Sequence, residues 1–207
     1  MKGRGEHLLV LAKEPVPGRV KTRLCPPCSP NEAAAIAAAA LADTLEAVAA
    51  CGVPRKILAL DGEPGPWLPP GMTVIHQRGR DFTERLTNAW LDAGGPGVQI
   101  GMDTPQVQPE ELERAVEAAT RTARSAVLGP AQDGGWWLIG WRDADPTAVF
   151  RNIPLSSSRT APDQLRRLHE LGLDVTTIAR HRDIDTIEDL HAVTTRYPRL
   201  RVAAAAS

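Results

Sequence analysis

The stretch Val98-Gln99-Ile100-Gly101-Met102-Asp103-Thr104-Pro105 gives the clearest indication of how this chain folds. A short apolar run that follows a glycine-rich segment predicts a buried strand, and the run ends in the carboxylate of Asp103. In open α/β sheets ligands bind beyond the carboxyl ends of the strands, where an acid can hold a divalent cation against a phosphate. A turn, or a cap for the helix that starts near Pro109, would explain the same aspartate, so both interpretations stay open here.

A basic loop follows the first predicted strand, residues 7–12. Two prolines and a glycine in this loop are incompatible with regular structure, and four cations fall within it: Lys13, Arg19, Lys21 and Arg23. Such side chains at a strand end suit the oxygens of a di- or triphosphate. The spacing of a Walker A loop is absent, and a basic loop exposed to solvent is the competing interpretation.

The rest of the chain alternates between predicted helices and strands. Helices are predicted over 31–51 with Ser29 or Asn31 as the cap, from Asp81 or Thr83 to 90, over 109–123 and 163–171, and after Asp185 or Thr186. Strands are predicted over 56–60, 72–76, 125–128 and 175–178, with a turn at 133–135 between two apolar runs and a mixed loop over 143–159. This alternation, together with the basic loop after the first strand and the acids after later strands, predicts a nucleotide-binding α/β sandwich.

Length and composition indicate one domain, with a core over residues 7–195 and a frayed tail over 196–207. The formal net charge of -1 gives no basic field, which disfavours nucleic acid as a partner. The apolar run near the start is too short for a membrane span and lacks a cleavage site, and no other segment is expected to reach that length. The sequence leaves the oligomeric state undecided between a monomer and a homodimer.

The three cysteines favour a reducing compartment, with the cytoplasm as the expected location. Cys25 and Cys28 have CxxC spacing, which is typical of redox-active cysteine pairs and of half the ligand set of a zinc site. A structural zinc ion would need two more ligands, and the only other cysteine is the distant Cys51. We therefore expect the pair to be chemically inert, with a zinc-binding module as a remote alternative.

Four motifs in order resemble a known family: AKEPVPGRVKTRL (12–24), IGMDTP (100–105), GPAQDGGWWLIG (129–140) and RDIDTIEDL (182–190). The chain is similar to bacterial glycosyltransferase-A-like proteins of the nucleotide-diphospho-sugar transferase superfamily, which are related to the molybdenum-cofactor and 2-phospholactate guanylyltransferases. The resemblance spans about residues 7–195. It implies a three-layer α/β/α sandwich with a mainly parallel central sheet, the GT-A fold.

The resemblance also implies a set of site residues and a cofactor. Mg²⁺ or Mn²⁺ is expected at Asp103, with Asp183 and Asp185 of the late DxD segment as further ligands. A capped helix start would explain Asp185 but not Asp183, and metal binding gives Asp183 a role. The expected catalytic residues are Lys13, Arg23 and Asp133, the last of which matches the region that meets the acceptor. The nucleotide is expected to contact Ala12, Lys13, Gly18, Arg19, Lys21, Arg23, Gln77 and Asp81.

The expected function is a metal-dependent, glycosyltransferase-like transfer that uses a nucleotide-sugar or nucleoside triphosphate donor and a small-molecule acceptor. A nucleotidyltransferase acting on a phosphorylated small molecule and a catalytically silent nucleotide or sugar-phosphate binder are the alternatives. In a glycosyl transfer Asp133 would be the base. Met102 and Leu155 depart from the family's small residue and tryptophan, both on the acceptor side. Trp136, Trp137 and Trp141 are expected to pack rather than to stack on a sugar.

Overall fold

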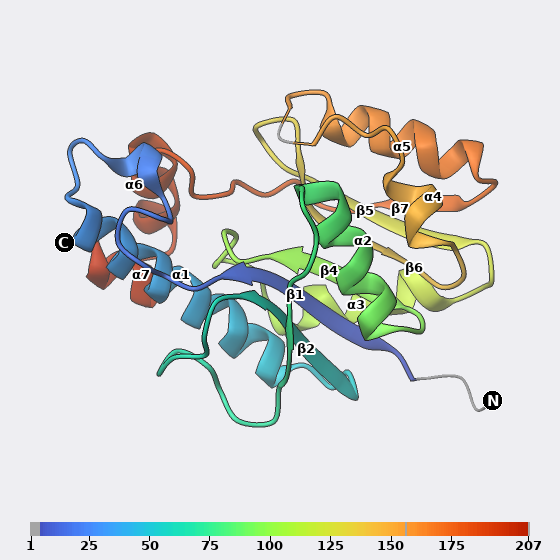
Figure 1. Ribbon diagram of the computed structural model, residues 1–207, viewed down its shortest axis with the longest axis horizontal. Helices are drawn as coiled ribbons and strands as arrows, with labels where there is room; N and C mark the ends of the chain where they lie inside the picture. Colours follow the sequence, from blue (N-terminus) through green and yellow to red (C-terminus); the bar gives the residue numbers. More distant parts are fainter. Residues whose placement is uncertain (1–4, 156, 207) are drawn as a thin grey trace.

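The computed structural model describes residues 5–155 and 157–206, and its centre is one seven-stranded sheet in the order β3-β2-β1-β4-β6-β5-β7 (Figure 1). The strands are β1 (His7–Lys13), β2 (Arg55–Asp61), β3 (Thr73–His76), β4 (Gly97–Gly101), β5 (Ser125–Pro130), β6 (Trp136–Trp141) and β7 (Asp174–Thr177). Only β6 runs antiparallel to its neighbours, β4 and β5, among the described strands. The predicted, mainly parallel sheet is therefore confirmed.

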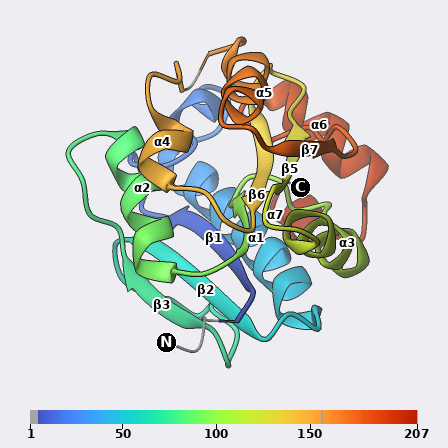
Figure 2. The ribbon, with the colours of Figure 1, turned by 90° about the vertical axis from the view of Figure 1, so that its right-hand side faces the viewer.

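Helices cover both faces of the sheet, so the predicted three-layer α/β/α sandwich is also confirmed (Figure 2). One layer holds α1 (Pro30–Ala50) and α3 (Pro109–Thr120), and the other holds α2 (Phe82–Ala93), α4 (Pro146–Phe150) and α5 (Thr160–Glu170). A short 3-10 turn, η1 (Thr22–Leu24), and two late helices, α6 (Ile187–Arg196) and α7 (Arg201–Ala205), complete the described elements. Helix α4 lies within the segment predicted to be a mixed loop.

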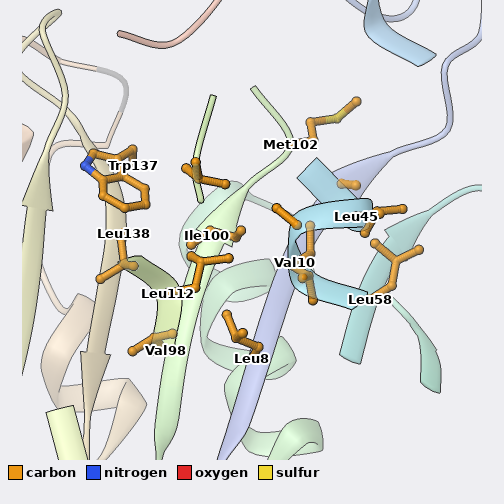
Figure 3. Packing of buried hydrophobic residues seen from close by; sticks show 14 of the residues in the cluster. Leu8, Val10, Leu45, Leu58, Val98, Ile100, Met102, Leu112, Trp137 and Leu138 are labelled. Atoms are coloured by element: carbon orange, nitrogen blue, oxygen red, sulfur yellow. The ribbon is translucent and has the colours of Figure 1, made fainter. Parts of the chain in front are cut away.

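The central strand β1 is apolar on both faces because it lies between the two helix layers. Leu8 and Val10 face α1 and α3, whereas Leu9 and Leu11 face the opposite layer, as the period of two in a strand requires. Figure 3 shows the first of these clusters, in which side chains from three strands and two helices interdigitate: Leu45, Leu58, Val98, Ile100, Leu112 and Leu138. Burial on both faces fixes where β1 and β4 end.

Three helix starts settle the alternatives that the sequence left open. Ser29 rather than Asn31 caps α1, in a capping box with Glu32. Asp81 rather than Thr83 caps α2 by accepting a hydrogen bond from the backbone N–H of Glu84. Thr186 caps α6, and this leaves the carboxylate of Asp185 available for other contacts.

Helix α1 is buried along two sides, which explains its alanine-rich and apolar sequence. One side faces the sheet through residues such as Leu41 and Leu45, and the other packs Ile36 against α6 and α7. By length and composition it is the one helix in the described chain that could cross a membrane, with 56% of its most apolar window buried. The expectation that no segment reaches that length is therefore wrong.

Within the C-terminal segment that the sequence suggested to be frayed, residues 201–205 form α7, which packs against α1 (Figure 1). The buried carboxylate of Asp43 in α1 accepts hydrogen bonds from the backbone N–H groups of Arg201 and Val202, at 3.0 Å each. It therefore satisfies two of the four N–H groups that a helix start leaves without partners. Val202 is fully buried beside it.

Asp43→Ala is expected to lower the free energy of unfolding by about 1–2 kcal/mol, because two helix-end donors lose their acceptor. Urea denaturation measures the loss, and amide hydrogen exchange at Val202 should accelerate. Glu46→Ala is the matched control: Glu46 lies on the same helix and contacts Arg201 at the surface, where an ion pair contributes about 0–1 kcal/mol. Equal losses in the two variants would contradict the capping role of Asp43.

Candidate functional site

A cavity of about 890 Å³ lies beyond the carboxyl ends of the central strands. The loop that leaves β1, the tip of β4, the turn before β6 and the segment before α6 all contribute to its walls. Eleven of the twelve residues predicted for the site line it: Ala12, Lys13, Arg19, Lys21, Arg23, Gln77, Asp81, Asp103, Asp133, Asp183 and Asp185. Gly18 lies in the same loop but does not line the cavity.

Lys21 forms the centre of the polar floor of this cavity. Its Nζ lies 2.9 Å from Asp103 Oδ1 and 3.0 Å from Asp185 Oδ1, and only 8% of its side chain is exposed. The two carboxylates come from segments 82 residues apart, so this ammonium group joins the β4 tip to the segment before α6. Arg23 makes a longer, exposed contact of 3.4 Å with Asp185.

Burial and ion pairing shift the pKa of Lys21 in opposite directions. Burial by itself would lower the pKa of Lys21, but the nearby carboxylates of Asp103 and Asp185 overcome that effect and raise the pKa above its ordinary value. The backbone of Lys21 is left-handed, with φ of 47°, a conformation that costs a non-glycine residue about 1–2 kcal/mol. The ion pairs hold the residue in this conformation, and the side chain is turned inward rather than toward solvent.

The late DxD segment reaches the β4 tip through its own backbone. The N–H of Ile184 donates to the carbonyl of Asp103 at 2.9 Å, and Gln106 Nε2 donates to the carbonyl of Arg182 at 2.8 Å. Ile184 is fully buried against α1 and α6. Because side chains alternate along an extended segment, its neighbours Asp183 and Asp185 lie on the cavity side.

Asp183 is in a different environment from Asp185. Its carboxylate accepts a hydrogen bond from Thr104 Oγ1 at 2.8 Å, and no ion pair is formed by Asp183 in the part of the chain that the structure describes. Burial raises the pKa of Asp183 to about 7; the bond from Thr104 opposes this, and the charges of Asp103 and Asp133 add to it. The carboxyl group of Asp183 therefore keeps its proton to a much higher pH than an ordinary aspartate does.

The Asp133-Gly134-Gly135 turn forms the opposite wall, next to the start of α5. Asp133 Oδ1 accepts from the N–H of Gly135 at 2.8 Å. Gly134 has φ of +92°, and a Cβ there would collide with the backbone of Ser158, so glycine allows the turn to pack against that loop. The turn predicted here is confirmed, and the antiparallel pairing of β5 and β6 makes it the turn of a hairpin.

The three tryptophans of β6 have different surroundings. Trp137 and Trp141 are buried, in agreement with the predicted packing role, and Trp141 stacks on Trp90. Trp136 is half-buried against Phe150 and lines the cavity together with Trp137. Trp136 therefore belongs to the cavity wall, which the packing interpretation did not anticipate.

Several residues of the cavity wall were not predicted from the sequence. Thr104 follows Asp103 directly, and its hydroxyl group next to a strand-end acid was the signal that could have identified it. No such signal marks Arg80, Phe82, Arg85 and Thr160, because only the fold brings them to the cavity.

The donor set suits a divalent metal ion that also contacts a phosphate. No three His, Cys, Asp or Glu side chains within residues 5–155 and 157–206 converge as a complete metal site. Two carboxylates do converge, since Asp103 and Asp185 point at the single position held by the Lys21 ammonium group. Mg²⁺ is commonly bound by one or two carboxylates, waters and substrate phosphates, so two protein ligands are compatible with it.

The CxxC pair lies near this loop but not in the cavity wall. Cys25 and Cys28 are free, half-buried thiols that pack against the cluster of α1, α6 and α7. Burial and the nearby charge of Glu32 raise the pKa of Cys28, which disfavours the reactive thiolate. These observations support the inert interpretation of the pair.

The protonation of Asp183 predicts an unusual dependence of stability on pH. Its carboxyl group has a pKa of about 7 in the folded chain and 3.8 as the reference value, so between these values the folded state binds the extra proton. The free energy of unfolding should therefore fall as pH rises from about 4 to about 7, by up to about 4 kcal/mol. Solvent that reaches the partly buried group reduces this figure.

Asp183→Asn should remove this slope and make the protein more stable than the wild type at pH 8, with little difference at pH 4. Urea denaturation in EDTA across this range measures it. Asp174→Asn, at an exposed carboxylate of β7, serves as the control for loss of one surface charge. Parallel pH profiles for the wild type and Asp183→Asn would contradict the assignment.

Comparisons with known proteins place the chain in a family. The model of a family described as "Uncharacterized protein conserved in bacteria (DUF2064)" matches residues 34–157. A protein of Streptosporangium roseum named phosphoenolpyruvate guanylyltransferase is 32% identical over 183 residues, which cover 83% of this chain and 78% of that protein. A protein of the same name from Thermomonospora curvata is 31% identical over 193 residues, covering 89% and 81%.

The fold is shared with a crystal structure from Desulfovibrio desulfuricans G20 that carries the name nucleotide-diphospho-sugar transferase. The TM-score is 0.86 at 25% identity, and the match covers 97% of this chain and 93% of that one. The superfamily and the guanylyltransferase relatives suggested by the four motifs are thus confirmed. The protein is a transferase with the nucleotide-diphospho-sugar transferase fold, and its chain belongs to the DUF2064 family.

Proposed function

We propose that this protein is a metal-dependent nucleotidyltransferase that joins the nucleotidyl group of a nucleoside triphosphate to a phosphorylated small molecule. The observation that carries the proposal is the convergence of Asp103 and Asp185 on one position, that of the Lys21 ammonium group in the basic loop. The similarity to two guanylyltransferases over most of the chain supports this type of transfer, with a guanosine nucleotide as the first candidate donor.

In this proposal the basic residues of the cavity would bind phosphate and the acidic residues would bind the metal ion. Lys13, Arg19 and Arg23 line the cavity at the end of β1, where they would bind the triphosphate and neutralise the charge that develops on the departing pyrophosphate. Asp103 and Asp185, with Asp183 close by, would hold Mg²⁺ or Mn²⁺. When bound, that cation would add Lewis-acid stabilisation of the phosphate charge.

The transfer itself needs no protein nucleophile. An oxygen of the acceptor's phosphate attacks the α-phosphorus, a new P–O bond forms, and the bond to pyrophosphate breaks with its electron pair going to the leaving group. The acceptor would lie between the Asp133 turn and the start of α5, where Ser157, Ser158 and Thr160 supply hydroxyl groups at the cavity wall. An acceptor that is already a phosphate dianion requires no general base.

Glycosyl transfer is the second candidate, favoured by the similarity to the protein named nucleotide-diphospho-sugar transferase. In that reaction an acceptor hydroxyl group attacks the anomeric carbon and a nucleoside diphosphate departs. Asp133 lies at the acceptor wall, where its carboxylate could take the hydroxyl proton. The two reactions release different products, which makes them separable by assay.

The test supplies GTP, ATP, CTP or UTP with phosphoenolpyruvate or 2-phospholactate, and in parallel UDP-glucose or GDP-mannose with sugar acceptors, in Mg²⁺, Mn²⁺ or EDTA. Pyrophosphate release that requires both metal and acceptor is the expected result. Asp103→Asn should lower its rate by at least about a hundredfold, because removing one transition-state electrostatic contact costs about that factor. Release of a nucleoside diphosphate, or metal-independent turnover, would overturn the proposal.

Lys21→Met tests the metal position without any turnover. In EDTA the variant should lose about 3 kcal/mol of unfolding free energy, because two partly buried carboxylates lose their shared cation. With the ammonium group gone, Mn²⁺ should bind more tightly than to the wild type and should restore much of the lost stability. Calorimetric titration and thermal unfolding measure the two effects.

Arg23→Met is the matched control for Lys21→Met, since it removes a cation that also contacts Asp185 but is 73% exposed. It should change Mn²⁺ affinity less than Lys21→Met does. If Mn²⁺ fails to stabilise Lys21→Met, Asp103 and Asp185 do not form the metal position.

A further inference from the structure

Gln99 is a polar side chain in the middle of the central strand β4, and it is only 1% exposed. Trp90 of α2 donates its indole N–H to this side chain at 2.7 Å. Because an indole nitrogen only donates, the atom that it meets is the oxygen of Gln99, and this fixes the orientation of the amide. The two N–H donors of Gln99 Nε2 have no hydrogen-bond partner among the described residues, and Gln99 lines the cavity. The amide is therefore a fixed donor at the inner end of the cavity.

Trp136 supplies a second donor. Its Nε1 is buried and has no hydrogen-bond partner in the described part of the chain, and the residue lines the cavity. A buried donor without a partner costs free energy. The other two tryptophans of β6 donate their N–H groups to backbone carbonyl groups. Trp136 is thus the exception on this strand, and its N–H is left available to a ligand.

Gly101 leaves space above Gln99 on the same face of the sheet. Residues two apart in a strand share a face, and the register pairs Gln99 with Leu9 and Gly101 with Leu11 of β1. A Cβ at Gly101 would meet only the backbone nitrogen of Asp103, at 3.9 Å, and the backbone of this glycine is not left-handed. The position could therefore hold a side chain, and the presence of glycine keeps the space above Gln99 open.

The inner subsite is the part of the cavity lined by Leu11, Arg85, Gln99, Gly101, Trp136 and Leu155. Leu11 and Leu155 are its apolar walls. Arg85 adds a positive charge from α2, and within the described chain only its Nη1 is paired, with Asp61 at 2.8 Å. These six residues include no acid, so the inner subsite offers donors and a positive charge. A carboxylate suits it, because each carboxylate oxygen accepts hydrogen bonds and a charged acceptor strengthens them.

The inner subsite is separated from the expected metal position by several bond lengths. Gln99 precedes Asp103 by four residues, and a strand rises about 3.3 Å per residue, so the two positions are about 10–13 Å apart. A phosphorylated acid with three carbon atoms is too short to reach both, since bonded atoms lie only about 1.5 Å apart. A stem of about six to eight carbon atoms would span the distance.

We propose that Gln99 and Trp136 determine acceptor specificity by binding the carboxylate of a long phosphorylated acid, whose stem lies over Gly101. The phosphate at the other end of this acceptor would lie at the metal position. The inference rests on the proposed function, because it names the substrate class for the acceptor of that transfer. The class is longer than the phosphoenolpyruvate after which the two relatives are named.

Four phosphonates test the length and the head group on the wild-type protein. Calorimetry in Mn²⁺ measures the affinities of 8-phosphonooctanoate, 3-phosphonopropionate, octylphosphonate and 8-aminooctylphosphonate. The first should bind at least about tenfold more tightly than each of the others, since a hydrogen bond to a charged group is worth about a factor of ten or more. Equal affinities for 8-phosphonooctanoate and octylphosphonate would mean that the inner subsite holds only water, and would overturn the inference.

Trp136→Phe tests the second donor, because it keeps an aromatic ring and removes an N–H that has no partner in the described chain. It should weaken 8-phosphonooctanoate by about tenfold and leave octylphosphonate and the melting temperature unchanged. Trp141→Phe is the matched control on the same strand: it removes an N–H that donates to the carbonyl of Ala144, away from the cavity. It should lower the melting temperature and change neither affinity.

Two further variants test the space and the fixed amide. Gly101→Val fills the space with a residue that favours strands, so the advantage of 8-phosphonooctanoate over 3-phosphonopropionate should disappear while Mn²⁺ affinity stays the same. Gln99→Glu keeps an oxygen for Trp90 and replaces the N–H donors with an acceptor. It should therefore weaken 8-phosphonooctanoate and make 8-aminooctylphosphonate the tighter ligand. An unchanged preference in either variant would overturn the inner subsite.

The outcomes distinguish this inference from the proposed function. Pyrophosphate release that is equally efficient with short and long phosphorylated acids retains the proposed function and overturns the inner subsite. Preferential binding of 8-phosphonooctanoate that depends on Trp136, in a protein that releases a nucleoside diphosphate from a nucleotide sugar, retains the inner subsite and overturns the proposed function.

Discussion

The ion pairs of one buried lysine hold this site together. Lys21 is placed between Asp103 and Asp185, and by joining them it connects three segments that are remote in sequence: the loop after β1, the tip of β4 and the approach to α6. Burying an ammonium group among carboxylates rarely adds much stability compared with an apolar replacement, but removing one member leaves a charge without compensation. The three side chains are therefore arranged for function at some cost to stability, as the left-handed backbone of Lys21 also indicates.

The apolar surroundings make this arrangement possible. Ile184 lies between the two acids of the DxD segment and is buried against α1 and α6, so the core fixes where Asp183 and Asp185 lie. Helix α1 needs an apolar partner on its second side, which α6 and α7 supply. The C-terminal tail is thus part of what supports the late acids, and the capping of α7 by Asp43 connects the tail to the same helix.

The cavity has two chemically different ends around this polar floor. Next to β3 and α2 the wall carries the polar side chains of Gln77 and Asp81 and the exposed ring of Phe82, where a nucleobase would lie. Next to α5 it carries hydroxyl groups, a carboxylate and the half-buried Trp136, which suit a small polar acceptor. The basic loop lies between the two ends, where phosphates would be. The division follows from the strand order, because β1 and β4 at the centre separate β3 from the β5–β6 hairpin.

The sequence by itself determined the alternation of strands and helices, because strand ends and helix caps are local signals. Its four motifs, through their resemblance to a family, implied the mainly parallel sandwich and the eleven predicted residues that line the cavity. Only the tertiary structure decided that Thr186 rather than Asp185 caps α6, that α7 packs on α1, and that Lys21 turns inward to the carboxylates while its neighbours Arg19 and Arg23 remain exposed. The last two of these outcomes depend on pairings between residues more than 80 positions apart, such as Asp43 with Arg201 and Lys21 with Asp103 and Asp185. The energy of such a pair depends on burial and distance, which no local pattern contains.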